Sequence, residues 1–170
     1  MIRVLILALA LMSLGCSALP RAERTPSHAV SATDRREVQV LLEQLYGSFN
    51  YGAGQEPDWR LMRASFIDGA QFVPEPSPDT PLRSYDVDTL IATWQSSMRA
   101  GPSTNLGYSE WISSTSVDKV GELLRVDVLF YGKEPGDSHP RKPGLDSLLL
   151  ARVGGSWKVL SFVVHNESKL

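Results

Sequence analysis

The second half of the chain is a succession of strand-type segments, and this feature most constrains the fold. Residues 124–131 have an apolar side chain at every second position, the pattern of a strand with one buried face: Leu124, Val126, Val128 and Phe130 alternate with Arg125, Asp127, Leu129 and Tyr131. Residues 106–117 form an earlier segment, and residues 147–153 and 157–165 form a hairpin across two glycines. Residues 132–144 are polar and contain prolines, which predicts a loop. These segments predict a curling antiparallel sheet that needs a covering layer on one face.

The first half supplies amphipathic helices that can form this layer. Ser31 or Thr33 can cap the first helix, whose apolar residues recur at helical spacing. A second, short helix follows, then a strand over residues 70–73, and then a third helix that starts at Ser84 or Asp86. The order helix, helix, strand, helix and then sheet predicts an α+β domain.

The N-terminal residues have the order of a secretory signal. Residues 1–3 are a short start with one basic residue, Arg3, residues 4–14 are almost wholly apolar, and small residues follow. The apolar run is shorter than the about 20 residues that a membrane-spanning helix needs. We therefore expect residues 1–16 to be a signal-peptide segment and the domain to be exported.

Cys16 is the only cysteine, so no disulfide can form within the chain. Residues 12–16, Met-Ser-Leu-Gly-Cys, resemble a bacterial lipobox, which implies lipidation of Cys16. That anchor would hold the domain at the outer membrane or the periplasmic face of the cell envelope. Ordinary signal-peptidase cleavage after Ala18 is the alternative, and it implies a soluble periplasmic or secreted protein. Residues 17–32 predict a disordered tether, and residues 33–170 predict the folded domain.

Several short motifs, in this order of elements, resemble the nuclear transport factor 2-like superfamily, in particular its SnoaL-like branch. The motifs are Leu-Tyr-Gly-Ser-Phe-Asn at 45–50, Pro-Asp-Trp at 57–59, Phe-Ile-Asp-Gly-Ala-Gln-Phe-Val at 66–73 and Gly-Ser-Trp-Lys-Val at 155–159. The resemblance implies a cone, in which three N-terminal helices pack on a strongly curved, mainly antiparallel sheet with a pocket at its open end. Because the superfamily contains both enzymes and non-catalytic binders, the fold leaves the function open.

Arg125, Asp127 and His165 are the candidate catalytic residues. Residues 125–129 resemble the strand that carries a catalytic arginine and aspartate in limonene-epoxide-hydrolase-type enzymes. Residues two apart on a strand face the same way, so Arg125 and Asp127 could both enter the cone. The second carboxylate that this resemblance requires would fall at Val164 and is absent. His165 could be a general base oriented by Asp127, or a solvated residue at a strand end.

The missing partners favour a non-catalytic domain that binds a small apolar ligand. An enzyme of epoxide hydrolase, isomerase or dehydratase type, using Arg125 and Asp127, is the alternative. Six residues are expected to line the pocket: Tyr46, Phe72, Trp94, Trp111, Leu129 and Tyr131.

Composition and patterning also bear on partners. No metal-ligand spacing, phosphate loop or nucleophile elbow occurs, so we expect neither a metal nor a cofactor. A formal net charge of −2 argues against nucleic-acid binding. Residues 157–165 are apolar on both faces of their strand. Because the helices can cover only one face of the sheet, this pattern predicts a homodimer through the outer face.

Overall fold

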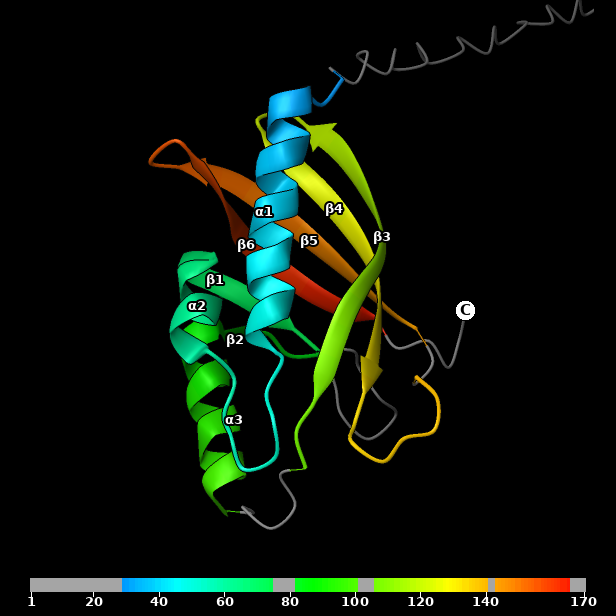
Figure 1. Cartoon of the computed structure of the whole chain (residues 1–170). Helices are drawn as coiled ribbons and strands as arrows, with labels where there is room; N and C mark the ends of the chain where they lie inside the picture. The colour runs from blue at the N-terminus through cyan, green and yellow to red at the C-terminus, as the bar shows by residue number, and fades with distance from the viewer. Residues whose placement is uncertain (1–28, 75–81, 101–105, 141–142, 166–170) are drawn as a thin grey trace, which may run out of the picture.

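The structure is a computed structural model, and it describes residues 29–74, 82–100, 106–140 and 143–165 (Figure 1). The predicted signal peptide, Cys16 and most of the tether lie outside the described residues. The elements, in chain order, are α1 (Ala32–Ser48), α2 (Trp59–Ala64), β1 (Phe66–Val73), β2 (Tyr85–Asp86), α3 (Val87–Ala100), β3 (Ser109–Val120), β4 (Leu123–Lys133), β5 (Gly144–Val153) and β6 (Ser156–His165).

Side-chain caps start the helices at positions that the sequence indicates. Ser31 Oγ accepts a hydrogen bond from the backbone N–H of Asp34 at 3.0 Å, which makes Ser31 the cap of α1. Asp58 caps α2, and Asp86 accepts from the backbone N–H of Thr89 at 2.8 Å at the start of α3. Of the alternatives in the sequence, the structure therefore selects Ser31 and Asp86.

The sheet has the order β2-β1-β6-β5-β4-β3. Strands β3 to β6 pair antiparallel with their neighbours, as predicted, whereas β1 pairs with β6 in parallel. The sheet is strongly curved and α1 lies across one of its faces (Figure 1). The α+β architecture and the mainly antiparallel sheet are confirmed.

The core lies between α1 and the inner face of the sheet. Val38, Leu42 and Leu45 of α1 are almost fully buried. The strand residues that meet them share one parity on each strand and are at most 1% exposed: Leu124, Val126, Val128, Leu148, Leu150 and Val159. Burying these branched side chains fixes which face of β4 and β5 points inward.

Two strands are longer than the sequence pattern indicates. The predicted strand over residues 70–73 is the end of β1, which begins at Phe66 because an irregularity between Phe66 and Gln71 lets it continue along β6. β5 begins at Gly144 rather than at residue 147, since Leu145 and Asp146 continue the pairing with β4 and β6. This extension places Asp146 inside the sheet. Among the described helices, none is both long and apolar enough to cross a membrane.

Candidate functional site

A cavity of about 740 Å³ opens between α3, β1 and the ends of strands β3 to β6, and we call it the cone cavity. Half of its lining residues are aromatic, and they come from segments far apart in the sequence. The aromatic lining residues are Phe49, Tyr51, Trp59, Phe72, Tyr85, Trp94, Tyr108, Phe130 and Phe162.

Ring-to-ring contacts hold one wall of the cone cavity together. The Trp94 ring lies 5.9 Å from Phe72, 6.1 Å from Phe49 and 6.3 Å from Trp59, measured between ring centroids. Phe72 also stacks on Phe162 at 5.3 Å. Aromatic pairs at such distances stabilise one another beyond the burial of their area. The wall therefore has a defined shape before any ligand enters.

Asp146 of β5 places a carboxyl group in this apolar setting. The residue is 2% exposed, and its Oδ2 accepts a hydrogen bond of 2.7 Å from Tyr46 Oη. Its Oδ1 is buried and has no hydrogen-bond partner. Burial raises the pKa of Asp146 from 3.8 to about 7, although the bond from Tyr46 opposes the increase. The pKa of Tyr46 is raised well above 10, by burial and then by the charge of Asp146.

Glu110, at the start of β3, brings a second carboxyl group to the same cavity. The pKa of Glu110 is raised from 4.5 to about 8, mainly by burial. A hydrogen bond with Tyr108 opposes this increase, and the charge of Asp146 adds to it. Asn50 holds this part of β3 in place, because its Oδ1 accepts from the backbone N–H of Glu110. Glu110 keeps partial exposure at its strand edge. Asp146 is therefore the more strongly desolvated of the two groups.

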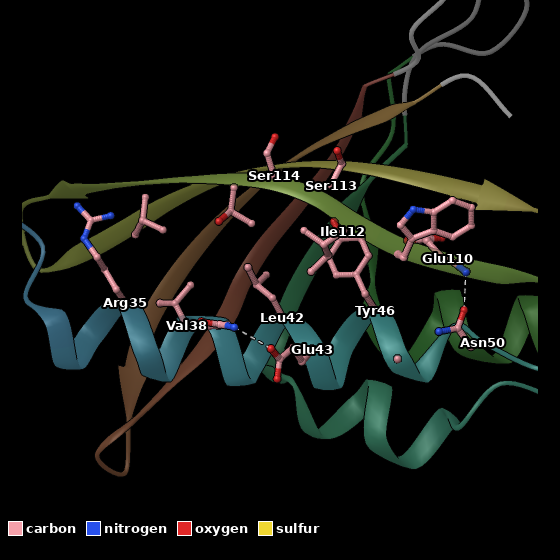
Figure 2. Close-up of a pocket in the computed structure, with 15 residues that line it drawn as sticks. Arg35, Val38, Leu42, Glu43, Tyr46, Asn50, Glu110, Ile112, Ser113 and Ser114 are labelled. Atoms are coloured by element: carbon pink, nitrogen blue, oxygen red, sulfur yellow. Dashed lines mark hydrogen bonds between the residues drawn. The ribbon is translucent and has the colours of Figure 1, made fainter. Parts of the chain in front are cut away.

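A second hollow, of about 680 Å³, runs between α1 and β3 and also borders Glu110. Figure 2 shows Tyr46 reaching from α1 toward β3 in this groove, with Asn50 bonded to the strand at Glu110. The groove contains both charge signs, Arg35 as well as Glu43. The cone cavity, by contrast, combines aromatic walls with one buried and one half-buried acid, so it is the candidate functional site.

Three of the six predicted pocket residues belong to this site. Phe72 and Trp94 line the cone cavity, and Tyr46 reaches it through its bond to Asp146. Trp111, Leu129 and Tyr131 have the opposite strand parity to the inner residues and do not line it. Trp111 and Tyr131 stack on each other at 6.0 Å, and Trp111 is 42% exposed.

The predicted entry of Arg125 and Asp127 into the cone is corrected by the structure. Arg125 pairs with Asp118 at 2.9 Å and is 54% exposed, and Asp127 accepts from Ser147 Oγ at 2.7 Å. His165 Nε2 lies 3.2 Å from the same Ser147 Oγ. The three candidates are thus neighbours on the outer face, away from the cavity. They face outward because the alternate residues of β4 fill the core.

Asp146 and Glu110 are the residues that sequence reasoning missed. A signal for Asp146 exists, since it has the parity of Leu148 and Leu150, which are buried. A lone carboxylate on the apolar side of a strand is expensive to bury, so it indicates a functional or specially partnered group. The signal was hidden because the predicted strand began at residue 147, three residues after the start of β5, and so left Asp146 out. In the part of the chain that the structure describes, no group of His, Cys, Asp and Glu could hold a metal ion.

Comparison with known proteins gives matches in structure only. No protein-family model and no curated protein sequence matches the chain. An NTF2-like protein of unknown function from Pseudomonas putida superposes with a TM-score of 0.61 at 15% identity, over 80% of this chain and 88% of that one. A protein of unknown function with a cystatin-like fold from Nostoc punctiforme gives 0.62 at 11%, over 83% and 96%.

A third similar structure comes from Novosphingobium aromaticivorans and is described as a proposed aromatic ring hydroxylase. It superposes with a TM-score of 0.62 at 13% identity, over 82% of this chain and 92% of that one. The superpositions establish the fold, whereas sequence identities this low leave the activity open. The element order, the curved sheet and these superpositions agree with the resemblance in the sequence, and the chain has the nuclear transport factor 2-like fold.

Proposed function

We propose that the chain is a binding domain whose cone cavity takes a small, largely apolar ligand with one polar group. The observation that carries this proposal is the aromatic cavity that ends at the unpartnered, buried Oδ1 of Asp146. A buried polar atom without a partner costs about 1–3 kcal/mol. A ligand that supplies the missing hydrogen bond recovers that cost, while its apolar part covers the aromatic walls.

Blocking the mouth of the cavity tests the proposal. Ser97 lines the cavity on α3, whereas its neighbour Ser96 does not. Ser97→Trp should abolish binding of an aromatic probe such as naphthylethanol in calorimetric titrations, because the indole occupies the space. Ser96→Trp adds the same side chain beside it and should leave binding intact. Equal affinity in both variants would place the probe outside the cavity and reject the proposal.

Acid–base catalysis on the bound molecule is a second candidate function, because the cavity holds two carboxyl groups with pKa values of about 7 and about 8. Groups that titrate near neutral pH suit proton transfer, as in isomerases and dehydratases. Under this hypothesis Asp146→Asn would keep ligand binding and lose turnover. A variant that retains turnover would exclude Asp146 as the acid or base.

The proposal includes an exported location with a lipid anchor at Cys16, and it is supported by the sequence of residues 1–16. Mass spectrometry of the protein purified from membranes would detect a diacylglyceryl group on Cys16, and Cys16→Ala should release the protein from membranes. An unmodified N-terminus behind Ala18 would instead support ordinary cleavage.

A homodimer through the outer face is also part of the proposal. It is supported by the exposed Trp111 and its stacking on Tyr131, since exposed aromatic pairs are common at interfaces. Light scattering at tens of micromolar should report a dimer, and Trp111→Ser should shift it toward monomer. A monomer in the unmodified protein would reject this part.

A further inference from the structure

The cone cavity is lined by two acidic groups that no basic side chain among its described lining residues offsets. Asp146 and Glu110 line it, while no Lys, Arg or His occurs among its described lining residues. The titratable groups that contact the two carboxyls are tyrosines: Tyr46 from α1 bonds to Asp146 and Tyr108 bonds to Glu110, while Tyr51 and Tyr85 also line the cavity. A tyrosine can donate one hydrogen bond but cannot neutralise a carboxylate.

The carboxyl groups of the cavity also have an acceptor oxygen for which the described residues supply no donor. Tyr46 donates to Oδ2 of Asp146, and a hydrogen bond also links Tyr108 and Glu110. Oδ1 of Asp146 remains buried and unpartnered. An alkylammonium group brings three N–H donors and a positive charge, so it could serve this oxygen and the Glu110 carboxylate together.

The aromatic walls favour the same chemistry. Ring faces carry negative electrostatic potential, and they attract cations within about 6 Å of the ring centroid, most strongly when water is excluded. Trp94 and Trp59 lie side by side in the wall, with their centroids 6.3 Å apart. Carboxylates at one end and indole rings along the side are the two features that recognise an organic ammonium ion.

We infer that the ligand of the cone cavity is an organic cation: an apolar or aromatic body that carries a protonated amine. This inference rests on the proposed binding function and specifies its ligand class. The amine lies against Asp146 and Glu110, and the apolar body lies among the rings of α3 and β1. A neutral carbonyl ligand is the competing class, because a protonated carboxyl group could donate a hydrogen bond to it.

Calorimetric titration with three probes of similar size separates these classes. The probes are naphthylethylamine, naphthylethanol and naphthylacetate, which are cationic, neutral and anionic at neutral pH. At about pH 8 the amine should bind at least about tenfold more tightly than the alcohol, and the acetate should bind weakest.

The pH dependence gives a second and opposite expectation for the two classes. A primary amine stays protonated up to about pH 10, whereas Asp146, with a pKa of about 7, becomes charged between about pH 6 and 8. Amine affinity should therefore rise about tenfold or more over this interval. A neutral ligand that accepts a hydrogen bond from the protonated Asp146 carboxyl would lose affinity over the same interval, because the carboxyl group loses its proton.

Two neutral variants locate the effect. Asp146→Asn and Glu110→Gln keep the size of each side chain, and each should remove most of the preference for the amine. Both should still bind naphthylethanol, which shows that the cavity remains folded. Asp127→Asn makes the same chemical change on the outer face and should leave all three affinities unchanged.

Each outcome decides a different point. If naphthylethanol binds as tightly as the amine at every pH, the cation inference is overturned while the binding function stands. If the amine preference survives in both neutral variants, the carboxyl groups do not recognise it, and the inference is again overturned. If none of the probes binds, the proposed binding of small aromatic molecules fails together with the inference.

Discussion

The wild-type protein should become less stable as the pH rises, because of Asp146. Replacing Asp146 with asparagine should abolish this part of the pH dependence. Burial in the apolar cavity raises the pKa of Asp146 from 3.8 to about 7. The folded protein therefore binds this proton more tightly than the unfolded chain does. The contribution to stability is complete below about pH 4, declines as the pH rises, and is lost above about pH 7.

The size of the effect follows from the two pKa values. A tenfold change in proton affinity corresponds to about 1.4 kcal/mol, so the full loss is about 4 kcal/mol. About 2.5 kcal/mol of it falls between about pH 5 and 8, because the folded protein begins to release the proton near pH 7. We work the magnitude for Asp146 only, since Glu110 keeps partial exposure and water screens it.

Urea denaturation followed by tryptophan fluorescence measures the free energy of unfolding at each pH. The free energy of unfolding of Asp146→Asn should rise relative to that of the wild type by about 2.5 kcal/mol from about pH 5 to 8. Any pH-independent cost of the amide, such as an extra buried donor, cancels in this comparison. Asp127→Asn is the control for the same change outside the cavity. Parallel curves for wild type and Asp146→Asn would refute the reasoning.

Three further changes test other contacts. Tyr46→Phe removes the donor to Asp146 and should cost about 1–2 kcal/mol in urea unfolding at neutral pH, with a steeper pH dependence because that bond lowers the pKa of Asp146. Gly144→Ala would push a methyl group into the ring of Phe130, which lines the cavity, so naphthylethanol affinity should fall several-fold in calorimetry. Unchanged affinity would show that Phe130 does not contact the bound probe. Ser31→Ala removes the cap of α1 and should lower the unfolding free energy by about 1 kcal/mol, and a change below about 0.3 kcal/mol would show that the cap is dispensable.

Local chemistry in the sequence predicted the elements of the fold well. The cap at Ser31 and the apolar stripe of α1 depend on neighbours three or four residues away, and such spacings are visible in the sequence. The parallel pairing of β1 with β6 depends on residues almost a hundred positions apart. No short-range pattern specifies that pairing, which is why only the fold resemblance anticipated a cone.

The site was harder to predict than the fold because two patterns on β4 competed. The resemblance of residues 125–129 to a catalytic strand suggested that Arg125 and Asp127 point inward. Core packing decided otherwise, since Val126 and Val128 are fully buried and successive strand residues face opposite sides. The acids that do enter the cavity lie at strand ends, where the predicted boundary and the true one differ by a few residues.

The position of β6 has a consequence for how the domain is made. β6 is the last of the described strands to leave the ribosome, yet it lies between β1 and β5 and pairs with both. Before residue 156 appears, β1 and β2 can form only a two-stranded ribbon, which is at best marginally stable in water. Until β6 pairs with both sides, the β1–β2 ribbon, on which α2 and α3 pack, has no strand pairing with the meander of β3 to β5, on which α1 packs. A chain interrupted before β6 would leave the two parts of the sheet unpaired with each other rather than form a smaller sheet.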